Sequence, residues 1–75
     1  MLARKRSVSI SGHRTSFSLE DEFFDCLRTL AEEQNLTLAS LVKTIDESRH
    51  RQSNLSSALR LYVLEAARHG KLAID

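Results

Sequence analysis

The feature that most constrains this chain is a short polar–apolar alternation that leads directly into an acidic helix start. Residues 14–19 read Arg-Thr-Ser-Phe-Ser-Leu, and Glu-Asp-Glu follows at once. In an extended strand Phe17 and Leu19 fall on one face. The opposite face carries Arg14, Ser16 and Ser18. A lone strand cannot pair its own backbone groups, so this segment needs a second strand, from its own chain or from an identical copy.

A second alternation precedes the first one, in the opposite phase. Val8 and Ile10 occupy even positions, whereas the apolar residues of 14–19 occupy odd positions. One straight strand cannot bury both pairs, because its side chains alternate strictly between two faces. Gly12 lies at the break and allows two solutions. It forms either a β-bulge that shifts the register or part of a two-residue hairpin loop.

The sequence favours the hairpin, with glycine first and His13 second in a type II′ loop. This loop would place Val8 opposite Phe17 and Ile10 opposite Thr15. One face of the ribbon would then hold the apolar residues. The other face would hold Ser7, Ser9, Ser11, Arg14, Ser16 and Ser18.

The first predicted helix runs from about Glu20 to Gln34. Its acidic start suits the positive end of the helix dipole, and Asn35 is a plausible end. Apolar residues recur with helical spacing at Phe23, Cys26, Leu27 and Leu30,. Since no base is placed to activate a thiol, Cys26 is interpreted as a small core residue.

Two further helices are predicted. One begins after Thr37, a good N-cap, and fades by Ser48; residues 49–53 are polar and are predicted to form a loop. The next begins at Ser53 or Asn54 and ends at Gly70. It is apolar nearly all round, because Leu61 and Leu64 lie opposite the face formed by Leu55, Ala58, Leu59, Tyr62, Val63 and Ala66. Such a helix indicates a subunit interface.

The size of the chain also indicates a partner. A domain of 75 residues is marginal alone,. Its single cysteine excludes an intrachain disulfide, and its three histidines lack zinc spacing, so we expect no metal and no cofactor,. A homodimer is the remaining support. The scarcity of cysteine fits the cytoplasm, and no apolar run suggests a membrane span or signal peptide.

Basic residues are concentrated at the start of the chain. Residues 1–14 contain no acid and carry a net charge of +4, whereas residues 15–75 carry −3. This asymmetry indicates a surface that prefers polyanions. We expect residues 1–6 to be a flexible basic arm and residues 7–75 to be a single domain.

The segment Arg14–Leu19, followed by Glu20–Leu27, resembles the ribbon-helix-helix proteins, the Arc/MetJ/CopG type of small bacterial repressor. The turn and second helix of that pattern correspond to residues 35–42, and the resemblance covers residues 14 to about 47. It implies a mainly α fold with an N-terminal β-ribbon. Two chains would pair their strands antiparallel and intertwine their helices, and here a C-terminal helix is added.

The resemblance also implies roles for individual residues. Outward strand residues would read bases, the N-terminal cations would grip DNA phosphates, and the start of the second helix would anchor a phosphate. The DNA-binding set is Arg14, Ser16, Ser18, Arg4, Lys5 and Arg6. The phosphate anchor is Thr37 or Asn54, because residues 54–60 also resemble the start of such a helix. The dimer interface is Phe17, Leu19, Leu41, Ile45, Leu59, Leu61, Tyr62 and Leu64.

Two departures from the family pattern matter. Residues 49–53 break the second helix, and residues 6–11 add a possible strand. If each chain of a dimer contributes a hairpin to one sheet, four strands span about 14 Å before side chains are added. The major groove is about 12 Å wide, so such a sheet would not enter it.

Two functions follow. The first is a DNA-binding homodimer that regulates transcription by inserting an intermolecular ribbon into the major groove of double-stranded DNA. The alternative is a module that binds a protein partner and no DNA. An enzyme is not expected, because the sequence shows no paired carboxylates, nucleophile–base set or glycine-rich phosphate loop.

Overall fold

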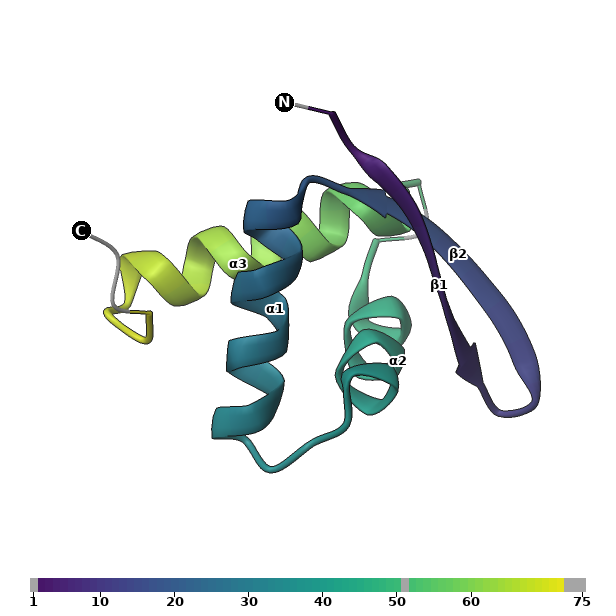
Figure 1. Ribbon diagram of the computed structural model, residues 1–75, viewed down its shortest axis with the longest axis horizontal. Helices are drawn as coiled ribbons and strands as arrows, with labels where there is room; N and C mark the ends of the chain where they lie inside the picture. The colour runs from purple at the N-terminus through teal and green to yellow at the C-terminus, as the bar shows by residue number, and fades with distance from the viewer. Residues whose placement is uncertain (1, 51, 73–75) are drawn as a thin grey trace.

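The structure is a computed structural model that describes residues 2–50 and 52–72. Two strands precede three helices: β1 (Arg4–Ile10), β2 (His13–Leu19), α1 (Asp21–Glu33), α2 (Leu38–Ser48) and α3 (Leu55–Arg68). The strands form an antiparallel hairpin whose tip extends beyond the helices (Figure 1). This order confirms the predicted ribbon followed by helices with an additional C-terminal one. The end of the predicted domain, residues 73–75, and residue 51 of the predicted loop lie outside the described residues.

The hairpin loop consists of Ser11 and Gly12, with φ angles of +50° and +81°. Two successive positive φ angles fit a type I′ loop, whose twist matches that of the strands. The hairpin prediction is therefore right, but the loop lies one residue earlier than Gly12-His13. Val8 pairs with Thr15, and seven residues of each strand are paired.

Moving the loop by one residue shifts every partner by two, so the paired residues keep their predicted faces, whereas Ser11 lies in the loop and not on the outer face,. Phe17 and Leu19 face the helices and are 4% and 0% exposed. The strand begins at Arg4, so the prediction that residues 1–6 form a flexible arm is wrong for residues 4–6. Extended pairing, rather than charge repulsion, decides the conformation of this basic segment.

Side chains cap the starts of two helices. The Thr37 Oγ1 accepts a hydrogen bond from the Ser40 amide at 3.0 Å, and the Asn54 Oδ1 accepts one from the Ser57 amide at 2.8 Å. Each cap satisfies an amide that the helix itself cannot pair. Both predicted helix starts are therefore confirmed.

Left-handed residues end α1 and α3 as predicted. Asn35 has a φ of +58°, and the next amide, that of Leu36, donates to the Ala31 carbonyl at 2.9 Å. Gly70 has a φ of +71°, and the Lys71 amide donates to the Ala66 carbonyl at 2.9 Å. These bonds form the Schellman arrangement, which pairs the last carbonyls of a helix.

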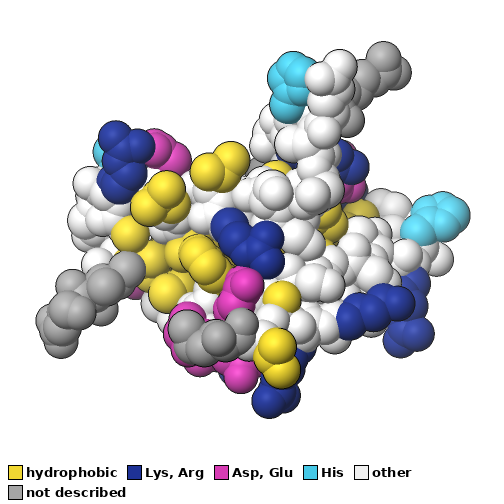
Figure 2. Space-filling model, turned by 90° about the horizontal axis from the view of Figure 1, so that it is seen from above, with side chains coloured by type: hydrophobic (Ala, Val, Ile, Leu, Met, Phe, Trp, Pro, Cys, Tyr) yellow, Lys and Arg dark blue, Asp and Glu magenta, His cyan; other side chains and the backbone are white. Residues whose placement is uncertain are grey.

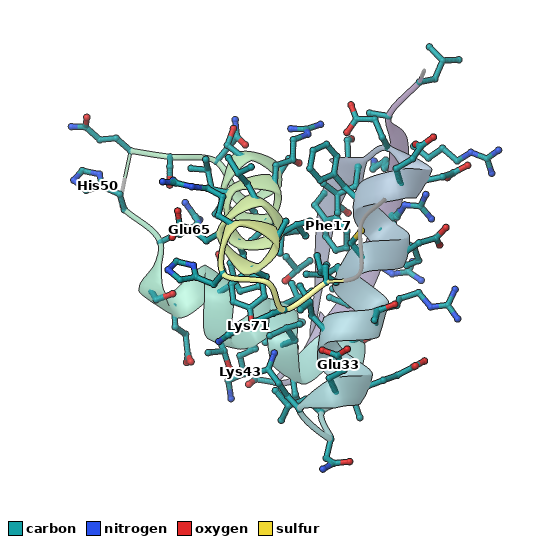
Figure 3. The ribbon with its side chains drawn as sticks, turned by 90° about the vertical axis from the view of Figure 1, so that its left-hand side faces the viewer. Phe17, Glu33, Lys43, His50, Glu65 and Lys71 are labelled. Atoms are coloured by element: carbon teal, nitrogen blue, oxygen red, sulfur yellow. The ribbon has the colours of Figure 1, made fainter. Side chains whose placement is uncertain are left out.

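The ribbon and the helices enclose one apolar core. Strand β1 packs on α2 and strand β2 on α3, and Figure 3 shows Phe17 pointing into the interior between α1 and α3. The core residues are Phe17, Leu19, Leu27, Leu30, Ala31, Leu41, Val42, Ile45, Leu55, Leu59, Val63 and Ala66.

Five predicted dimer contacts belong to this core: Phe17, Leu19, Leu41, Ile45 and Leu59. A single chain buries them, which corrects the expectation that a partner must cover them. The ribbon packs on the helices and covers these residues within the same chain. Of the predicted interface, only Leu61, Leu64 and the half-buried Tyr62 remain accessible, with Leu61 59% and Leu64 49% exposed.

Candidate nucleic-acid interface

The outer face of the ribbon is entirely polar. Three cross-strand pairs form it: Lys5 with Ser18, Ser7 with Ser16, and Ser9 with Arg14. All six point away from the helices because they alternate with the buried residues of each strand. The surface thus combines two cations with four small hydroxyl side chains and contains no acid.

The two cations of this face are free of internal partners. Among the described residues, no ion pair involves Lys5 or Arg14, and both are exposed. The structure therefore brings together Arg14, Ser16, Ser18 and Lys5 from the predicted DNA-binding set. Ser7 and Ser9 join them on this face, and their alternation with Val8 was the signal for that position.

The other two predicted DNA-binding cations lie on the inner face of the ribbon. The Arg6 guanidinium sits 3.9 Å from the centre of the Phe24 ring and donates to Asp21 Oδ1. The Arg4 Nε lies 3.5 Å from the same carboxylate oxygen. With its side chain only 19% exposed, Arg6 is a structural residue, which corrects its assignment to the DNA-facing set.

The same alternation explains this placement. Even-numbered residues of β1 face the helices, so Arg4 and Arg6 reach the first turn of α1, where Asp21 provides an acceptor. The carboxylate also suits the positive end of the helix dipole. Sequence reasoning missed this contact because it treated the cations as one mobile cluster.

Side chains near the start of α3 hydrogen-bond part of the free edge of β2, the edge that faces away from β1. The Ser18 amide donates to the Ser56 Oγ at 2.9 Å, and the Arg60 Nη2 donates to the Ser18 carbonyl at 3.4 Å. A two-residue hairpin loop directs the backbone groups of residues 14, 16 and 18 away from β1. At Ser18 those groups are satisfied by side chains of α3 rather than by another strand.

Arg60 also holds the joint between the ribbon and α1. Its Nε donates to Glu20 Oε1 at 3.0 Å. The hydrogen bond from Arg60 lowers the pKa of the Glu20 carboxyl below its usual range. Arg60 lies over the Phe23 ring as well, 6.0 Å from its centre. This contact between distant segments fixes the direction in which the ribbon leaves the helical body.

The two candidate phosphate anchors occupy different places. Asn54 begins the helix whose first turn contacts the ribbon through the Ser56–Ser18 hydrogen bond. Thr37 begins α2 after the turn that follows α1, and its side chain also donates to the Ser40 Oγ at 2.9 Å. Of these two helix starts, only that of α3 is joined to the ribbon by a hydrogen bond among the described residues.

The rest of the surface shows few chemical groups of note. Across residues 2–50 and 52–72 no group of three or more His, Cys, Asp or Glu side chains could hold a metal ion. Within the same residues, every helix is too short or too polar to cross a membrane.

Figure 2 shows hydrophobic side chains gathered on one face of the molecule, beside a touching basic and acidic pair.

The chain matches a known protein family. The family model described as the ribbon-helix-helix domain matches residues 3–67, which run from the residue before β1 almost to the end of α3. No curated protein and no solved structure gives a significant match. The match includes β1 as well as the strand and helices that carried the resemblance.

Proposed function

Because this chain belongs to the ribbon-helix-helix domain family, we propose that it is a DNA-binding regulator of transcription. It acts as a homodimer in the cytoplasm and reads double-stranded DNA with the outer face of its β1–β2 ribbon. It has no catalytic role, since no nucleophile–base pair stands on that face.

One observation carries this proposal. The outer face presents Lys5 and Arg14 among four serines, with no acid and no large apolar side chain. The guanidinium fork of Arg14 matches the two acceptors of guanine in the major groove, and serine hydroxyls contact bases or phosphates. Two strands lie about 4.8 Å apart, so a two-stranded ribbon enters a groove of about 12 Å.

The ribbon is formed within one chain, as the hairpin prediction expected, whereas the family resemblance implied pairing between the strands of two chains. Strand β1 takes the place expected for the strand of a partner. We therefore propose that the dimer forms away from the ribbon, through Leu61, Tyr62 and Leu64 of α3. A dimer of this kind leaves each ribbon two strands wide, which avoids the width of a four-stranded sheet.

Asn54 is the proposed phosphate anchor. The start of α3 contacts the ribbon at Ser18, so a duplex held by the ribbon passes close to the first amides of this helix. Helix N-termini favour anions through their unpaired amides and dipole. Thr37 is the second candidate, since α2 begins with the same kind of cap.

The test is selection of binding sites from random double-stranded DNA, followed by gel shift over a salt series. We expect Arg14→Ala to lose about 1–3 kcal/mol of binding free energy on the selected site and to relax its sequence preference. The matched control is Arg28→Ala, which removes an exposed arginine from α1. Full sequence-specific affinity in the Arg14→Ala protein would contradict the proposal.

A protein-binding module is the second candidate. The exposed Leu61 and Leu64 favour it, because apolar residues on an outer helix face suit a partner surface,. In that case no DNA would be retarded even at low salt, and a protein partner would bind tightly.

A further inference from the structure

The two strands of the ribbon repeat one sequence pattern. Residues 5–10 read Lys-Arg-Ser-Val-Ser-Ile, and residues 14–19 read Arg-Thr-Ser-Phe-Ser-Leu. An offset of nine residues aligns a cation, two serines and two large apolar residues of one strand with those of the other. A six-residue repeat is too short to stand out in a sequence, but the strand register gives it a spatial meaning.

Because of the way the two strands pair, this repeat gives the ribbon local two-fold symmetry. Ser7 lies directly opposite Ser16, and the strands are antiparallel. A two-fold axis through the midpoint of this pair therefore carries each residue of β1 onto the residue nine positions later in β2. The axis exchanges Lys5 with Arg14, and it exchanges Ser9 with Ser18.

The two cations consequently occupy diagonal corners of the outer face. Along the ribbon they are separated by four residues, about 14 Å at about 3.4 Å per residue,. That distance equals about four base-pair steps of about 3.4 Å each. Double-helical DNA has two-fold axes perpendicular to its own axis, so the axis of the ribbon can coincide with one of them.

The ribbon is complete in one chain. Strand β1 occupies one edge of β2, and Ser56 and Arg60 satisfy the backbone of Ser18 on the other edge. A second β2 that paired along this edge as far as Ser18 would have to displace the side chains of Ser56 and Arg60. The internal repeat thus supplies both halves of a symmetric ribbon without a second chain.

We propose that the ribbon of one chain within the dimer reads a short DNA element that is nearly two-fold symmetric, with Arg14 and Lys5 at its two ends. This inference rests on the proposed function. The symmetry is imperfect, because arginine binds guanine through a planar fork whereas lysine is a point charge. The element therefore has a strongly selected guanine at the Arg14 end and a weaker preference at the Lys5 end, about four base-pair steps away.

The experiment compares sites selected from random DNA by the wild-type chain and by three charge-preserving variants. Lys5→Arg is expected to strengthen the weak end and make the element more symmetric. Arg14→Lys is expected to weaken the strong end by about tenfold. The double variant Lys5→Arg/Arg14→Lys is expected to move the strongly selected guanine to the opposite end, relative to contacts made by the helical body.

Two results would overturn this inference while leaving the proposed function intact. One is a double variant that binds DNA with the wild-type preference at both ends. The other is native mass spectrometry of the Leu61→Glu/Leu64→Glu variant, designed to be monomeric, in which a duplex with one element still requires two chains to occupy it. Failure of the wild-type chain to select any DNA would instead overturn the proposed function itself. Circular dichroism of each variant confirms that the fold is retained.

Discussion

Arg60 of α3 bonds both carboxylate oxygens of Glu20, a residue forty positions earlier in the chain, at 3.0 Å and 3.4 Å. Glu20 stands between the last residue of β2 and the first residue of α1. The pair therefore ties the exit of the ribbon to the helix that packs beneath it. A planar guanidinium is suited to this two-point contact, which a lysine would not reproduce.

This pair predicts an acid-sensitive contribution to stability. Because Arg60 lowers the pKa of Glu20 in the folded chain, the contribution is fully present above the unfolded pKa, about 4.3 for glutamate,. It is lost as the pH falls through the lower, folded pKa. Denaturant unfolding at neutral and acidic pH should show a smaller pH dependence for Glu20→Gln than for the wild type. Glu33→Gln, at the exposed end of α1, is the control and should behave as wild type.

Arg6 and Arg14 predict opposite phenotypes. Arg6→Ala should destabilise the fold by about 0.5–2 kcal/mol, because it removes the stacking on Phe24, and should leave the selected DNA sequence unchanged,. Arg14→Ala should alter sequence selection with little effect on stability. Denaturant titration and site selection on both proteins check this. An Arg6→Ala protein of full stability with altered selection would refute the inner-face assignment.

The two helix caps distinguish the candidate phosphate anchors. Thr37→Ala and Asn54→Ala should each destabilise the fold by about 0.5–2 kcal/mol, because each removes the acceptor for one helix amide,. Only Asn54→Ala should also weaken DNA binding at every sequence, with an unchanged salt slope because no cation is removed. Equal DNA affinities for the two variants, compared at a temperature where both are folded, would argue against Asn54 as the anchor.

The exposed leucines of α3 predict the site of dimerisation. Leu61→Glu/Leu64→Glu should convert the dimer to a monomer, because the charges oppose burial of this face,. Analytical ultracentrifugation measures the change, and circular dichroism should show an unchanged fold. The matched control is Leu36→Glu, which alters a 38% exposed leucine outside α3. A dimer that survives the double substitution would place the interface elsewhere.

Local chemistry allowed much of this fold to be predicted. Alternation assigned the two faces of the ribbon, and residues such as Thr37, Asn54 and Gly70 marked helix ends by their own conformational preferences. The loop was predicted one residue too late, because Ser11-Gly12 and Gly12-His13 both suit a two-residue hairpin loop. The beginning of β1 at Arg4 was missed because a run of cations resembles a solvated arm when its partner strand is unknown.

The contacts between distant segments could not be predicted from the sequence. The Arg6–Phe24, Ser18–Ser56 and Glu20–Arg60 contacts depend on how elements dock, and no spacing along the chain encodes them. For the candidate site, Arg14 lies on the predicted outer face, whereas Arg4, Lys5 and Arg6 were assigned to one arm although the strand divides them between its two faces. Charge alone does not reveal which cations are already neutralised within the chain.

The Ser11-Gly12 loop that joins the two strands also has an evolutionary consequence. When two identical chains build a ribbon, every mutation appears twice, so both ends of a binding site must change together. Here each strand has its own codons, and a mutation at Lys5 leaves Arg14 untouched. The two ends of the ribbon can therefore diverge independently, one base preference at a time.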